Sequence, residues 1–186
     1  MLGRIGASVF AILAAIILAP PSYSASLPQL IDQRGHAFTF ADLRGTPLVV
    51  TFIAAHCTDA CPLINAQFSQ AAQQFAQQHT RVRLLTITLD PEHDSLSDMR
   101  TIAQRFNADP RTWIVAGGSR ANVHRVMQAF GVVAQQGRKG YADVHTTFVY
   151  FIDDRGRLRK TILASTALTQ QLVSELRAAA PHGSSK

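Results

Sequence analysis

The fold of this chain is decided by residues 47–62, which read PLVVTFIAAHCTDACP. The first half of the stretch, residues 47–54, is a continuous apolar and β-branched run, which is typical of a strand buried on both faces of a sheet. Cys57 and Cys61 follow directly. Apolar residues then recur at helical spacing: Ile64, Phe68, Ala71 and Phe75. The stretch therefore predicts a buried strand, a cysteine pair and a helix that runs to about Gln78.

The segments on either side predict further elements. Upstream, Gln29–Ile31 and Phe38–Phe40 flank the turn-rich DQRG and predict a short hairpin. Downstream, two helices begin with N-cap serines, Ser95 with Asp98 three residues on, and Ser119. The remaining pattern predicts strands over 82–89, 112–115, 146–152 and 158–163, a Gly117-Gly118 turn, a loop over 134–143 and a last helix over 168–179.

The order of these elements indicates the fold class. Strands that alternate with helices form a parallel core through right-handed crossovers, and the two hairpins add antiparallel edges. A strand, a cysteine pair at the start of a helix, a further β-α-β-α unit and a closing β-β-α make up the thioredoxin plan. We therefore expect an α/β protein with a central mixed sheet flanked by helices.

The N-terminus has the layout of a secretory signal peptide. Arg4 is followed by an apolar run to about Ala19, then by Pro20-Pro21 and a cluster of small residues. This run is shorter than the roughly 20 residues that a transmembrane helix needs. We expect a signal peptide over residues 1–26, cleaved after Ser24 or Ser26, with an uncleaved N-terminal anchor as the alternative. Residues 27–180 would form one domain, and residues 181–186 a disordered tail.

Composition argues against nucleic-acid binding. The formal net charge is +6, but the basic residues are scattered and few aromatic residues lie among them. Alternating charges such as Arg155, Arg157 and Arg159 are typical of a solvated strand face. The scattered basic residues are still compatible with a docking surface for an acidic protein partner.

The chain has two cysteines, Cys57 and Cys61. As a disulfide they would close a very small loop and constrain the unfolded chain little, so a purely structural role is disfavoured. At the start of a helix, backbone N–H groups and the helix dipole favour the thiolate, and His56 could add to this. The spacing of four allows either a disulfide or convergence of both sulfurs on one metal ion.

Two thiolates seldom complete a metal site, so a third ligand is expected among the seven histidines. A solvated or capping role is expected for five of them: His36, His79, His93, His124 and His182. His145 differs, because it opens the segment Val144-His145-Thr146-Thr147-Phe148. Thioredoxin-like proteins usually read V-P-T-T-F there, facing the cysteines. A histidine that merely begins a strand is the alternative.

Two thiolates and one imidazole form a soft donor set that suits Cu(I) and accepts Cu(II) with a longer fourth contact. Zinc would usually need a fourth firm ligand in a structural site. Met99 and Met127 lie on the inner faces of predicted helices and are expected in the core. The donor set therefore favours copper.

Three motifs together resemble the Sco/SenC family of copper proteins: AHCTDACP, TLDPEHD over Thr88–Asp94, and DVHTTFVYFID over Asp143–Asp153. The resemblance runs from about Leu30 to Leu172. It implies a thioredoxin-like fold with an extra N-terminal β-hairpin, and copper ligands at Cys57, Cys61 and His145. It also implies a metallochaperone at the outer face of the inner membrane or in the periplasm. Its partner would be a respiratory oxidase subunit, with CuA as the target centre, or another copper protein.

The chain departs from the family pattern at two positions. Thr58 replaces the usual proline after the first cysteine, and Asp143 lies two residues before His145 rather than next to it. Asp90 either forms a hydrogen bond near the site or simply ends its strand.

The rival hypothesis is an enzyme, a periplasmic thiol–disulfide oxidoreductase that keeps oxidase cysteines reduced. In it Cys57 attacks and Cys61 resolves. A peroxidase fits less well, because P-x-x-x-T-x-x-C is missing before Cys57.

Overall fold

The computed structural model describes residues 27–57, 60–137, 140–142, 144–145 and 147–179, with the side chains of residues 60, 144, 145 and 177–179 outside that description. The whole of the predicted signal peptide and of the predicted tail therefore lies outside the described residues. None of the described helices is long and apolar enough to cross a membrane.

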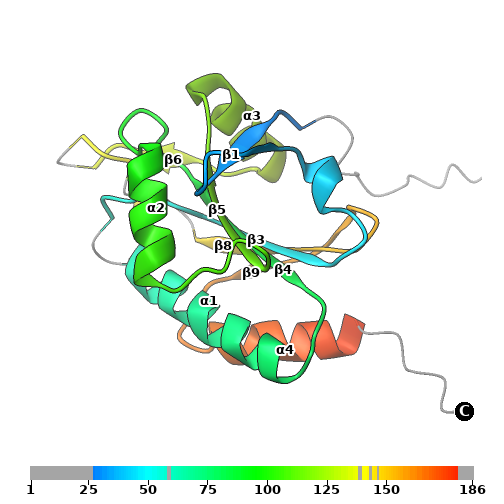
Figure 1. The fold of residues 1–186 in the computed structure, drawn as a ribbon. Helices are drawn as coiled ribbons and strands as arrows, with labels where there is room; N and C mark the ends of the chain where they lie inside the picture. Colours follow the sequence, from blue (N-terminus) through cyan, green and yellow to red (C-terminus); the bar gives the residue numbers. More distant parts are fainter. Residues whose placement is uncertain (1–26, 58–59, 138–139, 143, 146, 180–186) are drawn as a thin grey trace, which may run out of the picture.

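A seven-stranded mixed sheet forms the centre of the molecule (Figure 1). In spatial order its strands are β2 (Ala37–Phe38), β1 (Leu30–Asp32), β5 (Trp113–Gly117), β4 (Arg83–Thr88), β3 (Leu48–Ile53), β8 (Phe148–Ile152) and β9 (Leu158–Leu163). The three central strands β3, β4 and β5 are parallel, and the β1–β2 and β8–β9 hairpins add antiparallel strands at the two edges. This confirms the predicted thioredoxin-like architecture with its extra hairpin.

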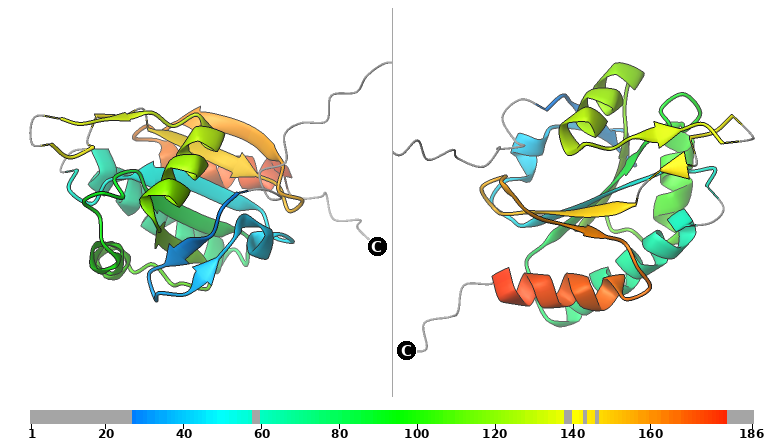
Figure 2. Two further views of the ribbon diagram at one scale, coloured as in Figure 1. Left: turned by 90° about the horizontal axis from the view of Figure 1, so that it is seen from above. Right: turned by 180° about the vertical axis from the view of Figure 1, so that it is seen from behind.

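Helices cover both faces of the sheet (Figure 2). The helix α1 (Ala60–Gln77) packs against α4 (Leu168–Ala179) on one face, and α3 (Arg120–Phe130) lies on the opposite face. The helix α2 (Leu96–Arg105) packs on β5, and a 3-10 turn, η1 (Phe40–Leu43), precedes β3. The layers explain why β3 is buried along its whole length, as its apolar run predicts.

Aromatic side chains fill the core on both sides of the sheet. On the α1 side Phe68 packs against Trp113, whose Nε1–H donates to Thr86 Oγ1 at 3.0 Å, so the indole donor is satisfied in the core. On the α3 side, Phe52 packs edge-on against Phe130 and Tyr150. Each face of the sheet therefore has its own packed aromatic cluster.

The two predicted N-caps are confirmed. Ser95 and Asp98 form a reciprocal capping box at the start of α2, and the Ser119 side chain accepts the Asn122 N–H at the start of α3. The helix α3 ends at Gly131, whose φ of 68° lies in the left-handed region that glycine adopts without strain.

Three details of the sequence-based prediction were wrong. The strand β5 continues through Gly117, which was expected in a turn, because Ile31 of β1 pairs with it. The predicted loop over 134–143 contains a strand, β6 (Ala134–Gln135), and the strand expected over 146–152 begins only at Phe148. His145 instead belongs to a separate strand, β7 (Val144–His145), which pairs with β6. Such two-residue pairings depend on tertiary contacts and carry no periodicity of their own.

Candidate metal centre

The two cysteines lie between the carboxyl end of β3 and the first turn of α1. Figure 1 shows these two elements. Cys57 precedes the helix and donates its backbone N–H to the Ala54 carbonyl at 3.2 Å. Cys61 lies in the first helical turn, where backbone N–H groups have no intrahelical partner. They are not joined by a disulfide, and both are buried, with 8% and 2% of the residue surface exposed. The predicted dithiol is therefore assembled, reduced and shielded from water.

The two thiols are coupled to one another. A hydrogen bond to Cys57 raises the pKa of Cys61 well above its ordinary value, burial adds to this, and the backbone of Ala54 acts in the opposite direction. Cys61 therefore keeps its proton and donates it toward Cys57. The roles predicted for the two cysteines, with Cys57 attacking and Cys61 resolving, stay predictions.

A buried carboxylate holds the cysteine segment in place. The Asp94 side chain is fully buried, and its Oδ2 accepts the Ala55 N–H at 3.0 Å and the Thr88 hydroxyl at 2.5 Å. Its Oδ1 lies 3.3 Å from Nδ1 of His56, next to Cys57. Burial raises the pKa of Asp94, and these three hydrogen bonds offset part of that rise. Asp94 thus ties the residues before Cys57 to the end of β4.

A second buried carboxylate holds the segment that leads to His145. Asp90 is 1% exposed, and its Oδ2 accepts the Ala142 N–H at 2.9 Å. Its Oδ1 lies 2.8 Å from Nδ1 of His93. The Asp90 side chain and the His93 ring are therefore joined by a hydrogen bond. The question left open by the sequence is thus answered, since Asp90 forms hydrogen bonds beside the site.

Three aromatic rings connect the cysteine segment with the segment that leads to His145. The His56 ring stacks on Tyr141 with ring centroids 4.3 Å apart and planes 2° apart. The His93 ring meets the same tyrosine edge-on at 5.1 Å. His56 precedes Cys57, and Tyr141 lies four residues before His145. These ring contacts therefore hold the cysteine segment against the segment that leads to His145.

Replacement of Asp90 by alanine is expected to loosen this arrangement. The buried Ala142 N–H would lose its acceptor, which costs about 1–3 kcal/mol of unfolding free energy. The amides of Tyr141 and Ala142 would exchange with solvent faster, while those of β3 and β4 would keep most of their protection. Hydrogen-exchange mass spectrometry and urea unfolding measure both effects. The control is Asp154→Ala at an exposed aspartate; equal exchange at Ala142 in both variants would contradict the assigned role.

The third predicted ligand, His145, is placed by its backbone alone. It lies in β7, where it pairs with Ala134 of β6, and its side chain is outside the described part of the structure. Among the described residues, no three His, Cys, Asp or Glu side chains form a group that could hold a metal ion. The set of Cys57, Cys61 and His145 therefore stays a prediction.

The structure brings in residues that sequence reasoning passed over. His93 was expected to be solvated or capping, yet it contacts both Asp90 and Tyr141. The signal was present in TLDPEHD, where a histidine follows the first aspartate by three residues and precedes the second. By contrast, the His36 side chain is 70% exposed and that of His124 43%, as expected for solvated histidines.

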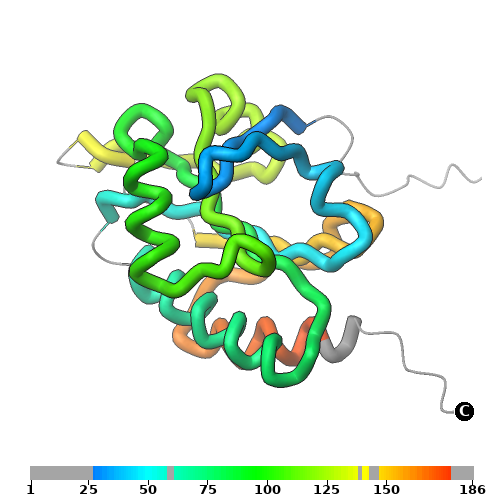
Figure 3. Tube along the Cα trace, viewed as in Figure 1, coloured from blue at the N-terminus to red at the C-terminus, as the bar shows by residue number. Residues whose placement is uncertain are grey.

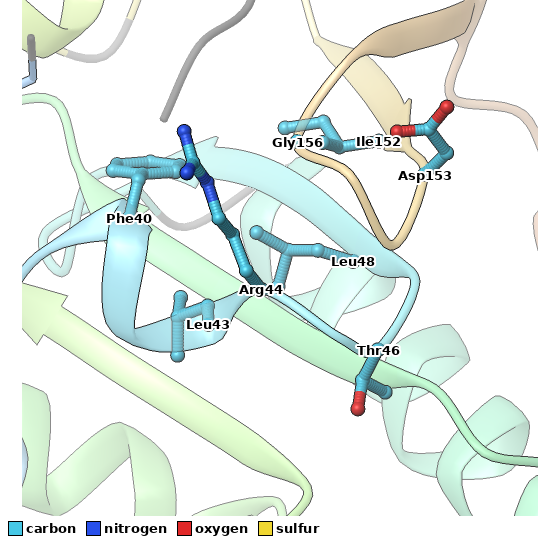
Figure 4. Close-up of a pocket in the computed structure, with 8 residues that line it drawn as sticks. All are labelled: Phe40, Leu43, Arg44, Thr46, Leu48, Ile152, Asp153 and Gly156. Atoms are coloured by element: carbon cyan, nitrogen blue, oxygen red, sulfur yellow. The ribbon is translucent and has the colours of Figure 1, made fainter. Parts of the chain in front are cut away.

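A hollow at the opposite end of β3 is not part of this site (Figure 4). It lies where Leu48 begins β3 and Ile152 ends β8, with Phe40, Arg44 and Asp153 around it. Its volume of about 10 Å³ is close to the minimum for one water molecule. It is therefore too small for a substrate or cofactor.

A thioredoxin-like fold with a buried, reduced dithiol at a strand–helix junction defines a class of thiol and metal-binding proteins. Within it, the chain belongs to the SCO1/SenC family, whose model matches residues 25–180. This confirms the resemblance carried by the three sequence motifs.

Individual relatives agree with this assignment. The chain is 29% identical over 133 residues to the mitochondrial SCO2 homologue of Bos taurus and 26% identical over 138 residues to an SCO2-like protein of Rickettsia typhi. These matches cover 68% and 71% of this chain, but only 49% and 66% of the relatives. The chain therefore spans about half to two thirds of the length of these curated relatives.

Solved structures extend the comparison. A structure of Bradyrhizobium japonicum ScoI with copper bound superposes with a TM-score of 0.70 at 25% identity and covers 86% of this chain and 98% of its own. A structure of Arabidopsis thaliana ScoI with copper bound gives a TM-score of 0.71 at 21% identity, with coverage of 84% and 99%. Both share the fold described above.

Proposed function

We propose that this protein is an exported copper-binding metallochaperone that delivers copper to a respiratory oxidase centre, CuA or a similar site. The observation that carries the proposal is the pair of reduced, buried thiols in hydrogen-bonding contact, held beside the segment that ends at His145. Thiolate sulfur is the soft donor that Cu(I) prefers, and an imidazole nitrogen extends the set toward Cu(II). The copper-bound ScoI structures support the same reading.

Two features of the site suit a carrier rather than a permanent copper centre. Only two thiolates and one imidazole are assigned as ligands, so a copper ion would keep a position open to an incoming donor. The near-complete burial of both cysteines protects their sulfurs from solvent before copper is transferred to a partner. Copper would then pass to the cysteines or histidines of an oxidase subunit or another copper protein by stepwise ligand exchange, without change in its oxidation state.

Copper titration of the reduced protein tests the proposal. We expect about one copper per chain, with sulfur-to-copper charge-transfer absorption in the Cu(II) form. Metal analysis gives the stoichiometry, and absence of binding at micromolar copper would overturn the proposal. The oxidoreductase alternative is not favoured by the family assignment, and variants of the ligands separate it from the chaperone.

We further propose that the protein acts in the periplasm or at the outer face of the inner membrane, after export directed by residues 1–26. The short apolar run that ends at Pro20-Pro21 supports this proposal. Mass spectrometry of protein from fractionated cells is expected to find a chain that starts after Ser24 or Ser26. An intact Met1 in the membrane fraction would instead indicate an uncleaved anchor, which associates the domain with the membrane.

A further inference from the structure

A pocket lies beside the cysteines and is lined by residues from the start of α1 and by residues of α2 and the turn after it. Figure 3 shows the course of these two helices in the Cα trace. Cys57, Cys61 and Asn65 line it on one side, and Ile102, Arg105 and Phe106 on the other. Its volume is about 120 Å³, roughly ten times the minimum for one water molecule. The pocket therefore has room for a molecule of several non-hydrogen atoms next to the thiols.

Asn65, on the wall of this pocket, carries an unpaired hydrogen-bond acceptor that is itself covered by neighbouring atoms. The residue is 2% exposed, and its Oδ1 has no donor among the described residues. Buried amide oxygens are almost always paired, because an unpaired one loses its hydration without compensation. If the amide turns toward the pocket, a ligand that offers an N–H group to this oxygen removes that cost.

The opposite wall carries charge. Arg105 is exposed, its guanidinium lies 5.5 Å from the centre of the Phe106 ring, and no carboxylate of the described residues forms an ion pair with it. The Asp98 carboxylate also lines the pocket, with one oxygen engaged by Ser95. An anion is thus attracted at Arg105, and an ammonium group at Asp98 and Asn65.

We propose that this pocket binds small cysteine-type thiols, that is, molecules that combine a thiol, a carboxylate and an amine. The carboxylate pairs with Arg105, the amine donates toward Asn65 and Asp98, and the thiol sulfur reaches Cys57 and Cys61. This inference deepens the proposed function and rests on it, because such a thiolate is a soft ligand from which Cu(I) can pass to the protein's own thiolates by ligand exchange.

Disulfide exchange on the metal-free protein gives a readout that needs no copper. With cystine, the Cys57 thiolate attacks one sulfur, forms a mixed disulfide and releases one cysteine thiolate, which takes up a proton. Cys61 then loses its proton and displaces the second cysteine. The protein dithiol is oxidised by two electrons to a disulfide, and cystine is reduced to two cysteines.

The experiment compares four small aliphatic disulfides that differ in charge: cystine, 3,3′-dithiodipropionate, 2-hydroxyethyl disulfide and cystamine. Rates with free dithiothreitol supply the intrinsic reactivity of each reagent. After this normalisation, we expect the protein to prefer cystine and the dicarboxylate over the neutral and cationic disulfides. Arg105→Gln should lower the rates with the two carboxylates by about two- to fivefold and leave the neutral rate unchanged.

Arg125→Gln is the matched control, because it removes the same charge from an exposed position on α3, on the opposite face of the sheet. Equal loss of the carboxylate rates in both variants would mean that net charge alone acts, and would overturn the proposal. A parent protein whose rate ratios equal those of dithiothreitol would overturn it as well.

The Asn65→Leu variant provides a second test of the proposed site. It should remove the advantage of cystine over dithiodipropionate, which lacks the amine, without affecting the advantage of the dicarboxylate over the neutral reagent. Thermal melting monitored by circular dichroism confirms that the variant is folded, and an unchanged cystine advantage in the folded variant counts against the site. Failure of copper binding would leave these rates as they are, so the two proposals fail separately.

Discussion

Replacement of both Cys57 and Cys61 by serine is expected to abolish copper binding. Serine keeps the shape of the side chain but replaces a soft sulfur by a hard, neutral hydroxyl, which is a poor ligand for copper. We expect the stoichiometry to fall from about one copper per chain to none. This corresponds to a loss of affinity of at least about a thousandfold, or about 4 kcal/mol of binding free energy. Competition with a chromophoric Cu(I) chelator measures the effect.

The double variant must be shown to fold, because Cys61 is almost fully buried and a serine there places a hydroxyl in an apolar environment. Circular dichroism and urea unfolding give this control, and a Cys57→Ala, Cys61→Ala variant separates loss of the ligands from the effect of the hydroxyls. If a folded double variant bound copper with the parent's stoichiometry, the proposed metal centre would be wrong.

The second large effect is expected for His145→Ala, which separates copper chemistry from dithiol chemistry. Two thiolates can still hold Cu(I) in a linear arrangement, so Cu(I) affinity should fall by about tenfold or more, about 1.4 kcal/mol for each factor of ten. Cu(II) prefers a fuller set with nitrogen donors, so its characteristic absorption should disappear. Disulfide formation between the cysteines needs only the two sulfurs and should continue at the parent's rate.

The matched control for this variant is His36→Ala, at a histidine whose side chain is 70% exposed in the turn of the N-terminal hairpin. Cu(II) absorption that persists unaltered in His145→Ala would exclude His145 as a ligand. Oxidase assembly in cells that survives His145→Ala but fails without the cysteines would favour the thiol–disulfide oxidoreductase.

The cysteine segment could be predicted because its chemistry is local. A strand that is apolar at every position must be buried on both faces, and a helix with an apolar stripe must begin soon after it, which leaves Cys57 and Cys61 at the junction. The N-caps at Ser95 and Ser119 were equally predictable, since a capping side chain bonds to a backbone group only three residues away. Such patterns lie within one or two turns of chain.

The support around the cysteines could not be predicted, because it joins segments that are distant in the sequence. The Asp94 carboxylate accepts a hydrogen bond from the backbone N–H of Ala55, 39 residues earlier. The Asp90 carboxylate accepts one from the N–H of Ala142, 52 residues later. The sequence left open whether Asp90 forms a hydrogen bond near the site, and it gave no role to Asp94. Their partners became known only with the fold, because a carboxylate can accept from any donor that packing brings within reach.

The sequence by itself therefore determined the order of strands and helices, the buried strand β3 and the cysteine pair at its end. Each follows from side-chain periodicity and helix capping, which act over a few residues. Only the tertiary structure decided that His145 lies in a separate short strand paired with Ala134, that His56 stacks on Tyr141, and that Asn65 and Arg105 share a pocket with the thiols. These contacts arise when the packing of helices and strands brings remote segments together. The conformational entropy lost when each segment is ordered is offset by the burial of apolar surface in the whole domain, and not by the segment's own residues.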